Sequence, residues 1–143
     1  VGHSGVQDTG DMAGSAGPIM PGDSYTFTIT VDSTNPNISL ASMVVPSNDT
    51  FLGTQPGGVS AYDGSGDLMS PGQIANAIED NLGFWDAGTE ANQAGAAGPD
   101  MAGFQSDPNT GMSEGSGAAT MQDGVWTYPM LSDIVRVTVE PAN

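Results

Sequence analysis

Acidic side chains greatly outnumber basic ones in this sequence, and that imbalance constrains the fold more than any other feature. The 143 residues include 17 Asp and Glu but a single Lys or Arg, Arg136, so the formal net charge is −16. Side chains therefore cannot neutralise the carboxylates, and a compact state needs solvent cations as a screening atmosphere or as bound divalent ions. We expect calcium-rich or salty surroundings. Nucleic acid is excluded as a partner, because neutralising phosphates requires many Lys and Arg.

Length and composition favour one domain covering residues 1–143. The 21 Gly and 10 Pro indicate long connections rich in turns. No stretch approaches the roughly 20 consecutive apolar residues of a membrane span. The absence of Cys excludes disulfides, thiolate metal sites and thiol nucleophiles.

Alternating apolar residues predict an all-β fold. In Ser24–Val31 the apolar residues Tyr25, Phe27, Ile29 and Val31 alternate with Ser and Thr, which is typical of a half-buried strand. Ile38–Val45 is apolar on both faces, which favours a strand in the middle of a sheet. Further strands are expected at three places: Gly58–Tyr62, Val125–Tyr128 and a closing strand Asp133–Glu140.

Two regions depart from the strand pattern. Between Pro71 and Asn81, Ile74, Ala77 and Ile78 recur at helical spacing after a Ser-Pro start signal, which predicts one or two helical turns. From Ala87 to Gly117 nothing periodic is found and Gly, Ala, Asp, Asn and Ser dominate. A stretch of this length within a domain indicates a functional loop, a loop organised by metal, or disorder.

Two short acidic segments, Val45–Gly53 and Phe84–Asn92, are candidates for a metal site. Hard cations take six to eight oxygen ligands from carboxylates, carbonyls and water, and loops at strand ends supply them from several directions. The candidate ligands of a calcium ion are Asp49, Asp86, the carbonyl of Ala87, and Glu90. The alternative is that Asp49 and Asp86 only form turns or caps.

The same segments resemble a known family. Ser42–Gly53, followed by Trp85–Glu90, is similar to the spondin N-terminal domain of animal matrix proteins and bacterial secreted proteins. The Pro21–Phe27 strand start and the closing Val135–Val139 also resemble it. The resemblance implies an antiparallel β-sandwich of C2-like type with long Gly/Asp-rich loops, which hold calcium through Asp49, Asp86, Glu90 and the Ala87 carbonyl. It also implies export to the extracellular space or cell surface.

A departure from that family bears on assembly. Bacterial members have an additional strand before a segment similar to Val1–Gly5, and that strand is missing from this sequence. A sandwich without one strand favours pairing with a strand from another chain. Strand exchange into a homo-oligomer or filament is therefore one expectation, and truncation of the sequence is the alternative.

Together these features predict a secreted, calcium-binding, non-catalytic module that acts in extracellular adhesion or matrix and contacts a matrix or cell-surface component. The alternative is a self-assembling subunit of a filament or surface layer. A carbohydrate-active enzyme using Asp86 and Glu90 as acid and base is a remote third, because their loop position and their assignment to a metal site both count against it. A second cation in the irregular region would have four candidate ligands: Asp100, Asp107, Asn109 and Glu114.

Overall fold

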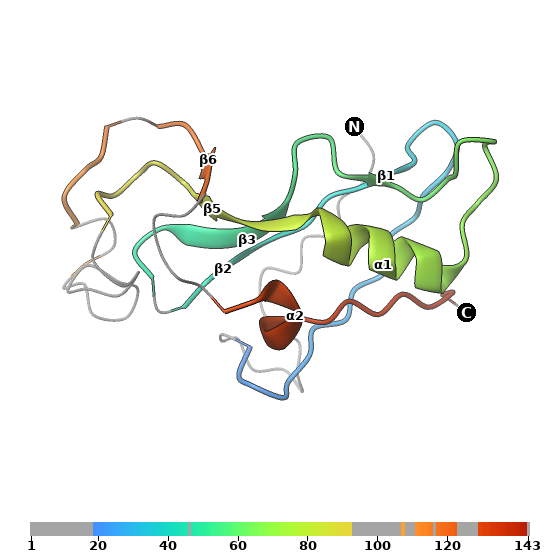
Figure 1. The fold of residues 1–143 in the computed structure, drawn as a ribbon, viewed down its shortest axis with the longest axis horizontal. Coiled ribbons are helices and arrows are strands. Elements are labelled where there is room, and N and C mark those ends of the chain that lie inside the picture. Colours follow the sequence, from blue (N-terminus) through green and yellow to red (C-terminus); the bar gives the residue numbers. More distant parts are fainter. Residues whose placement is uncertain are drawn as a thin grey trace.

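The regular structure is mainly β-strand, arranged in two antiparallel sheets (Figure 1). The computed structural model describes residues 19–45, 47–92, 107, 111–115, 117–122 and 129–142. The larger sheet has the order β2-β3-β5-β6, from strands Ala41–Met43, Thr50–Thr54, Leu82–Asp86 and Thr120–Met121. The smaller sheet pairs β1 (Asn37–Ile38) with β4 (Val59–Ser60). This arrangement agrees with the all-β class predicted from the sequence.

Helix α1 (Pro71–Asn81) lies where the apolar spacing predicts it. Its 11 residues make about three turns, so the prediction of one or two turns is too short. At its start, the backbone N–H and the hydroxyl of Ser70 both donate to Gln73 Oε1, at 3.0 and 2.7 Å. Pro71 occupies the first turn, where its missing N–H costs no hydrogen bond. The helix then buries one face, formed by Ile74, Ala75 and Ile78.

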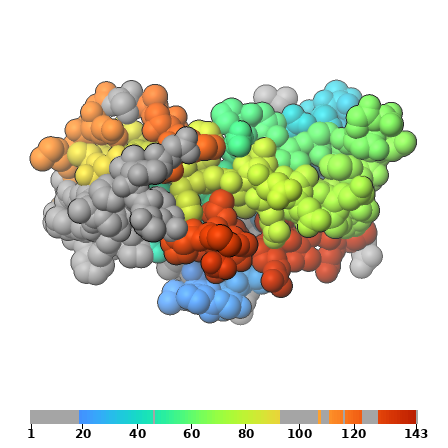
Figure 2. Space-filling view, in the orientation of Figure 1, coloured from blue at the N-terminus to red at the C-terminus, as the bar shows by residue number. Residues whose placement is uncertain are grey.

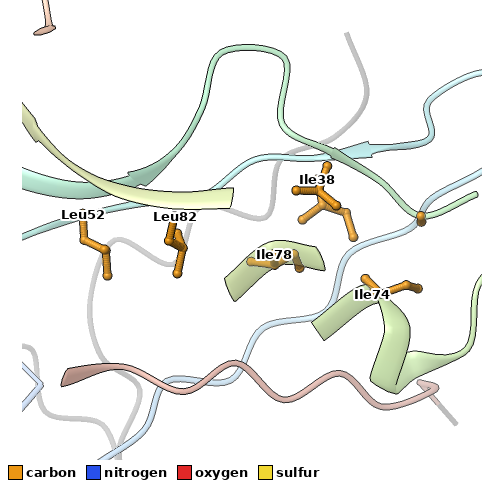
Figure 3. Packing of buried hydrophobic residues seen from close by; sticks show 7 residues of the cluster. Ile38, Leu52, Ile74, Ile78 and Leu82 are labelled. Atoms are coloured by element: carbon orange, nitrogen blue, oxygen red, sulfur yellow. The ribbon is translucent and has the colours of Figure 1, made fainter. Parts of the chain in front are cut away.

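The hydrophobic core lies between α1 and both sheets (Figure 3). Its buried members are Ile38, Leu52, Val59, Ala61, Ile74, Ile78 and Leu82. Leu52 and Leu82 come from the larger sheet, whereas Ile38 and Val59 come from the smaller one. Each buried aliphatic side chain contributes about 1.5–3 kcal/mol, and the apolar face of α1 packs in the core that both sheets share.

The predicted strands Ser24–Val31 and Asp133–Glu140 are wrong as strands. The first is an extended segment in neither sheet, and the second starts within helix α2 (Leu131–Ile134) and then continues as extended chain. The predicted inward faces are correct only in part: Ile29, Val31, Val135, Val137 and Val139 are partly buried against the core, whereas Phe27 is 48 % exposed. Alternation thus identified many of the inward side chains, but burial does not by itself bring a second backbone into hydrogen-bonding distance.

The C-terminal segment is anchored to α1 instead of to a strand. The N–H of Val137 donates to Glu79 Oε1 at 2.7 Å, and the segment runs along the helix in Figure 1.

The predicted strand Ile38–Val45 is divided between the two sheets. Its first residue belongs to β1 and pairs with β4, whereas β2 pairs with β3. Leu40 lies at the crossover, where its carbonyl accepts the N–H of Thr54 at 3.1 Å. All three residues of β2 are exposed at the sheet edge, so the prediction of a central strand covered on both faces is wrong.

The predicted strand Gly58–Tyr62 contains β4 and an isolated bridge between Tyr62 and Leu68. Gly58 has a φ of 67°, and a Cβ there would lie 2.4 Å from the carbonyl oxygen of Ile38, so the turn before β4 requires glycine. The predicted strand Val125–Tyr128 lies outside the described residues. Among the helices of the described residues, none is long and apolar enough to cross a membrane.

Candidate metal centre

The buried polar side chains gather where β3 begins and β5 ends. They are Ser47, Asn48, Asp49, Thr50, Asp86 and Glu90. Antiparallel pairing sets Thr50 opposite Asp86, and the N–H of Ala87 donates to the carbonyl of Asp49 at 3.2 Å. The ladder between β3 and β5 therefore brings the two acidic segments of the sequence together, at what we call the polar end of the molecule.

Asp49 is 8 % exposed, and its two carboxylate oxygens differ in their surroundings. Oδ2 accepts hydrogen bonds from the N–H of Thr89 at 2.9 Å, from its hydroxyl at 3.0 Å and from the N–H of Glu90 at 3.0 Å. Oδ1 is buried and has no hydrogen-bond partner among the described residues. Leaving a buried charged oxygen without a partner is costly, so Oδ1 needs a donor or a cation.

Asp86 is 3 % exposed and accepts hydrogen bonds on both oxygens. The N–H of Gly88 donates to Oδ1 at 2.6 Å, and Gly88 has a φ of 69°, which glycine adopts readily. Oδ2 accepts from Asn92 Nδ2 at 2.5 Å and from Gln122 Nε2 at 2.9 Å. These donors fix the orientation of the carboxylate.

A third part of the chain also lies at the polar end. It consists of residues 111–115 and 117–122, which we call the third segment. In Figure 2 its orange atoms lie next to the yellow residues that follow β5, away from α1. Its Glu114 offers a carboxylate oxygen within 4.8 Å of one oxygen each from Asp49 and Asp86. Two buried carboxylates at such a separation repel each other by about 3 kcal/mol at an effective dielectric constant of ~20.

The polar end also contains a second buried atom without a partner. Gln122 Oε1 has no hydrogen bond within the described part of the chain, and it shares this property only with Asp49 Oδ1. The amide cannot simply be flipped, because its Nε2 donates to the Asp86 carboxylate. Both atoms are therefore oxygens that lack an electropositive neighbour, and both belong to side chains grouped around Asp86.

Of the four predicted ligands, Asp49 and Asp86 have carboxylate oxygens in the group of three, whereas Glu90 does not. Asp49 and Asp86 come together as expected. Ala87 is half-buried beside them, with its N–H bonded to Asp49. Glu90 is 7 % exposed and its N–H binds Asp49, but its carboxylate is not one of the three grouped oxygens. It lies against Gly111, where an added Cβ would be 2.8 Å from the Glu90 Cδ.

Sequence reasoning assigned Glu114 to a separate cation and did not consider Gln122. Asp107 is exposed, whereas Asp100 and Asn109 lie outside the described residues. Glu114 sits in a region without periodicity, so no pattern places it near Asp49. Gln122 directly follows β6, and only the pairing of Met121 with Trp85 reveals its position.

Comparisons with known proteins return no match to a family model, to a curated protein or to a solved structure. The resemblance to the spondin N-terminal domain therefore stays a prediction.

Proposed function

We propose that this chain is a secreted, non-catalytic module of C2-like sandwich type, related to the spondin N-terminal domain, that binds calcium at its polar end and acts in extracellular adhesion or matrix. The observation that carries the calcium claim is the buried Asp49 Oδ1 without a partner, next to the grouped carboxylates of Asp86 and Glu114. A cation satisfies the unpartnered oxygen and removes the repulsion among the three carboxylates.

The chemistry of the donors favours calcium over other metals. The polar end offers carboxylate, amide and backbone oxygens, and the sequence contains no Cys and a single His. Zinc and copper select nitrogen and sulfur ligands, whereas calcium takes six to eight oxygens in irregular geometry. Magnesium demands near-octahedral geometry and retains its waters, which suits a site made by three separate chain segments less well.

The same contacts argue against catalysis. Asp86 accepts hydrogen bonds on both oxygens, and Glu90 lies buried against a glycine. A pair of glycosidase carboxylates needs an acid and a base that face the substrate. Fixed and buried carboxylates are better suited to holding a metal ion.

Thermal unfolding in calcium and in EDTA tests the proposal. Binding to the folded state alone adds about 2.7 kcal/mol when free calcium is 100 times the dissociation constant. We expect calcium to raise the melting temperature of the wild type, and Asp49→Asn to abolish that increase. Asp80→Asn, at an exposed position of α1, is the matched control and should keep it. Equal melting temperatures in calcium and EDTA would remove calcium from the proposal.

A self-assembling filament or surface-layer subunit is the second candidate, favoured by the exposed edge strand β2. Its residues Ala41–Met43 are exposed, and strand β3 covers only one of its two edges. Such an edge is a template for a strand from another chain. Light scattering across a concentration series separates the candidates, because a monomer at millimolar concentration is incompatible with a filament subunit.

A further inference from the structure

The third segment is joined to the rest of the polar end mainly by backbone hydrogen bonds. The N–H of Ala91 donates to the carbonyl of Met112 at 2.6 Å, and the N–H of Gly117 donates to that of Gly88 at 3.0 Å. At the β6 side, the N–H of Gln122 donates to the carbonyl of Phe84 at 2.9 Å. These contacts hold the third segment along the residues that follow β5.

Apolar burial contributes little to this attachment. None of the described residues in the third segment is buried, and Met112 is 75 % exposed. Met121 is half-buried and pairs with Trp85. A segment that buries so little apolar surface belongs to the low-stability part of a protein and opens without global unfolding.

Electrostatics opposes the attachment when no cation is present. Docking the third segment brings the exposed carboxylate of Glu114 up to two buried carboxylates, Asp49 and Asp86. It also buries Gln122 Oε1 without a partner. Gln122 Nε2 does donate to Asp86 Oδ2 at 2.9 Å, but the Glu114 carboxylate and Gln122 Oε1 both present oxygen to a place that already has negative charge. With a cation bound, the Glu114 carboxylate and Gln122 Oε1 would each contact a positive charge, and both would then favour attachment of the third segment.

We propose that the cation acts as a latch, with Glu114 and Gln122 as its ligands from the third segment. Cation binding closes the third segment onto the end of β5, and cation loss releases it together with β6. This inference rests on the proposed calcium site but adds two ligands and a regulated movement to it. Release uncovers the β5 edge at Trp85 and Asp86, where β6 pairs in the closed state. Calcium thereby controls access to a strand edge.

Hydrogen exchange followed by mass spectrometry tests the latch on the whole chain, with and without calcium. The informative amides are those that bridge the third segment, on Ala91, Gly117 and Gln122. We expect them to exchange at least about tenfold faster in EDTA, because the opening free energy falls when the ligand is removed. Amides in the middle of α1, such as that of Ile78, serve as the internal reference and should change much less.

Glu114→Gln separates a latch from a merely structural contact. Without calcium, the Glu114 carboxylate repels Asp49 and Asp86, and neutralising it removes that repulsion. The bridging amides of the variant should therefore exchange more slowly in EDTA than those of the wild type. The same variant should lose most of the calcium effect. Glu140→Gln, an exposed position on the C-terminal segment, is the control and should behave as the wild type. Faster exchange of Glu114→Gln in EDTA would overturn the latch.

Gly111→Ala supplies a reference for the released state. Its added methyl group would overlap the buried Glu90 carboxylate, so the third segment should exchange rapidly even in calcium. Gly64→Ala, which meets nothing within 4 Å, is the matched control.

Titration calorimetry on the same samples distinguishes the two proposals. Absence of calcium binding defeats both. Calcium binding that stabilises the protein but leaves the bridging amides unchanged defeats the latch alone and leaves the calcium site standing.

Discussion

The two ends of the larger sheet are stabilised by different physics. At the α1 end, buried aliphatic side chains such as Ile78 and Leu82 fill the space between helix and sheets. At the polar end, the buried residues are polar and include Asn48, Asp49 and Asp86, and many of their hydrogen bonds converge on carboxylates. The first end is stabilised mainly by the hydrophobic effect, whereas on the calcium proposal the stability of the second should depend on which ions the solvent contains.

On the calcium proposal, this difference would help a chain with net charge −16 to be compact. Apolar burial at the α1 end is indifferent to charge, so it supplies stability under any ionic conditions. The polar end concentrates carboxylates in one place, and a single divalent ion there offsets more repulsion than the same ion in a diffuse atmosphere. Three measurements test the contrast, in order of decreasing expected effect.

Ile78→Ala should have the largest effect and should ignore calcium. Ile78 is 2 % exposed in the centre of the core, and truncating such a residue removes about 2–5 kcal/mol of stability. Urea denaturation in calcium and in EDTA should give the same loss. A loss that depends strongly on calcium would mean that the two ends are not energetically distinct.

Asn48→Ala probes the polar end without changing its charge. The Asn48 amide donates to the carbonyls of Glu90 at 3.3 Å and Ala91 at 3.0 Å, and its removal leaves them without that donor. We expect a loss of about 1–3 kcal/mol in urea denaturation. Asn37→Ala is the control, because its amide also donates to a backbone carbonyl but lies exposed. Equal losses in the two variants would contradict the importance of burial here.

Asp32→Ala should have the smallest effect, and the effect should depend on pH. The backbone N–H groups of Asn35 and Thr34 donate to its carboxylate and lower its pKa from the usual 3.8. A depressed pKa stabilises the fold above the ordinary value, and that stabilisation is lost as pH falls through the folded-state pKa. Melting temperatures of wild type and variant should therefore differ slightly at neutral pH and converge in acid. A difference that persists at pH 2 would contradict this origin.

Local sequence signals predicted the α1 end well. A start signal at Ser70-Pro71 and the spacing of Ile74 and Ile78 placed the helix correctly, because a helix forms from contacts within one stretch of chain. Alternation in Ser24–Val31 identified Ile29 and Val31 as inward side chains but was wrong for Phe27, which is exposed. It failed to predict hydrogen bonding, since a strand requires a partner that periodicity does not specify.

The polar end was predictable only in part. Asp49 and Asp86 each adjoin or end a short apolar strand, and an antiparallel pair naturally brings such positions together. Glu114 and Gln122 follow a stretch rich in Gly and Ala, where the side-chain pattern carries no information on the path of the chain. The register of β6 with β5 reveals the position of Gln122, and the bridge between Glu90 and Ser113 reveals that of Glu114.

Helix α1 runs into β5 without a connecting loop, and this has a consequence for folding kinetics. Residue 82 begins the strand directly after Asn81 ends the helix, whereas Asp86 and Gln122 are 36 residues apart in the chain. Short-range contacts form faster than those that close long loops, so α1 and β5 should order first and the polar end last. Interactions made after the rate-limiting barrier slow unfolding without accelerating folding. Calcium should therefore lengthen the lifetime of the native protein and leave its refolding rate almost unchanged.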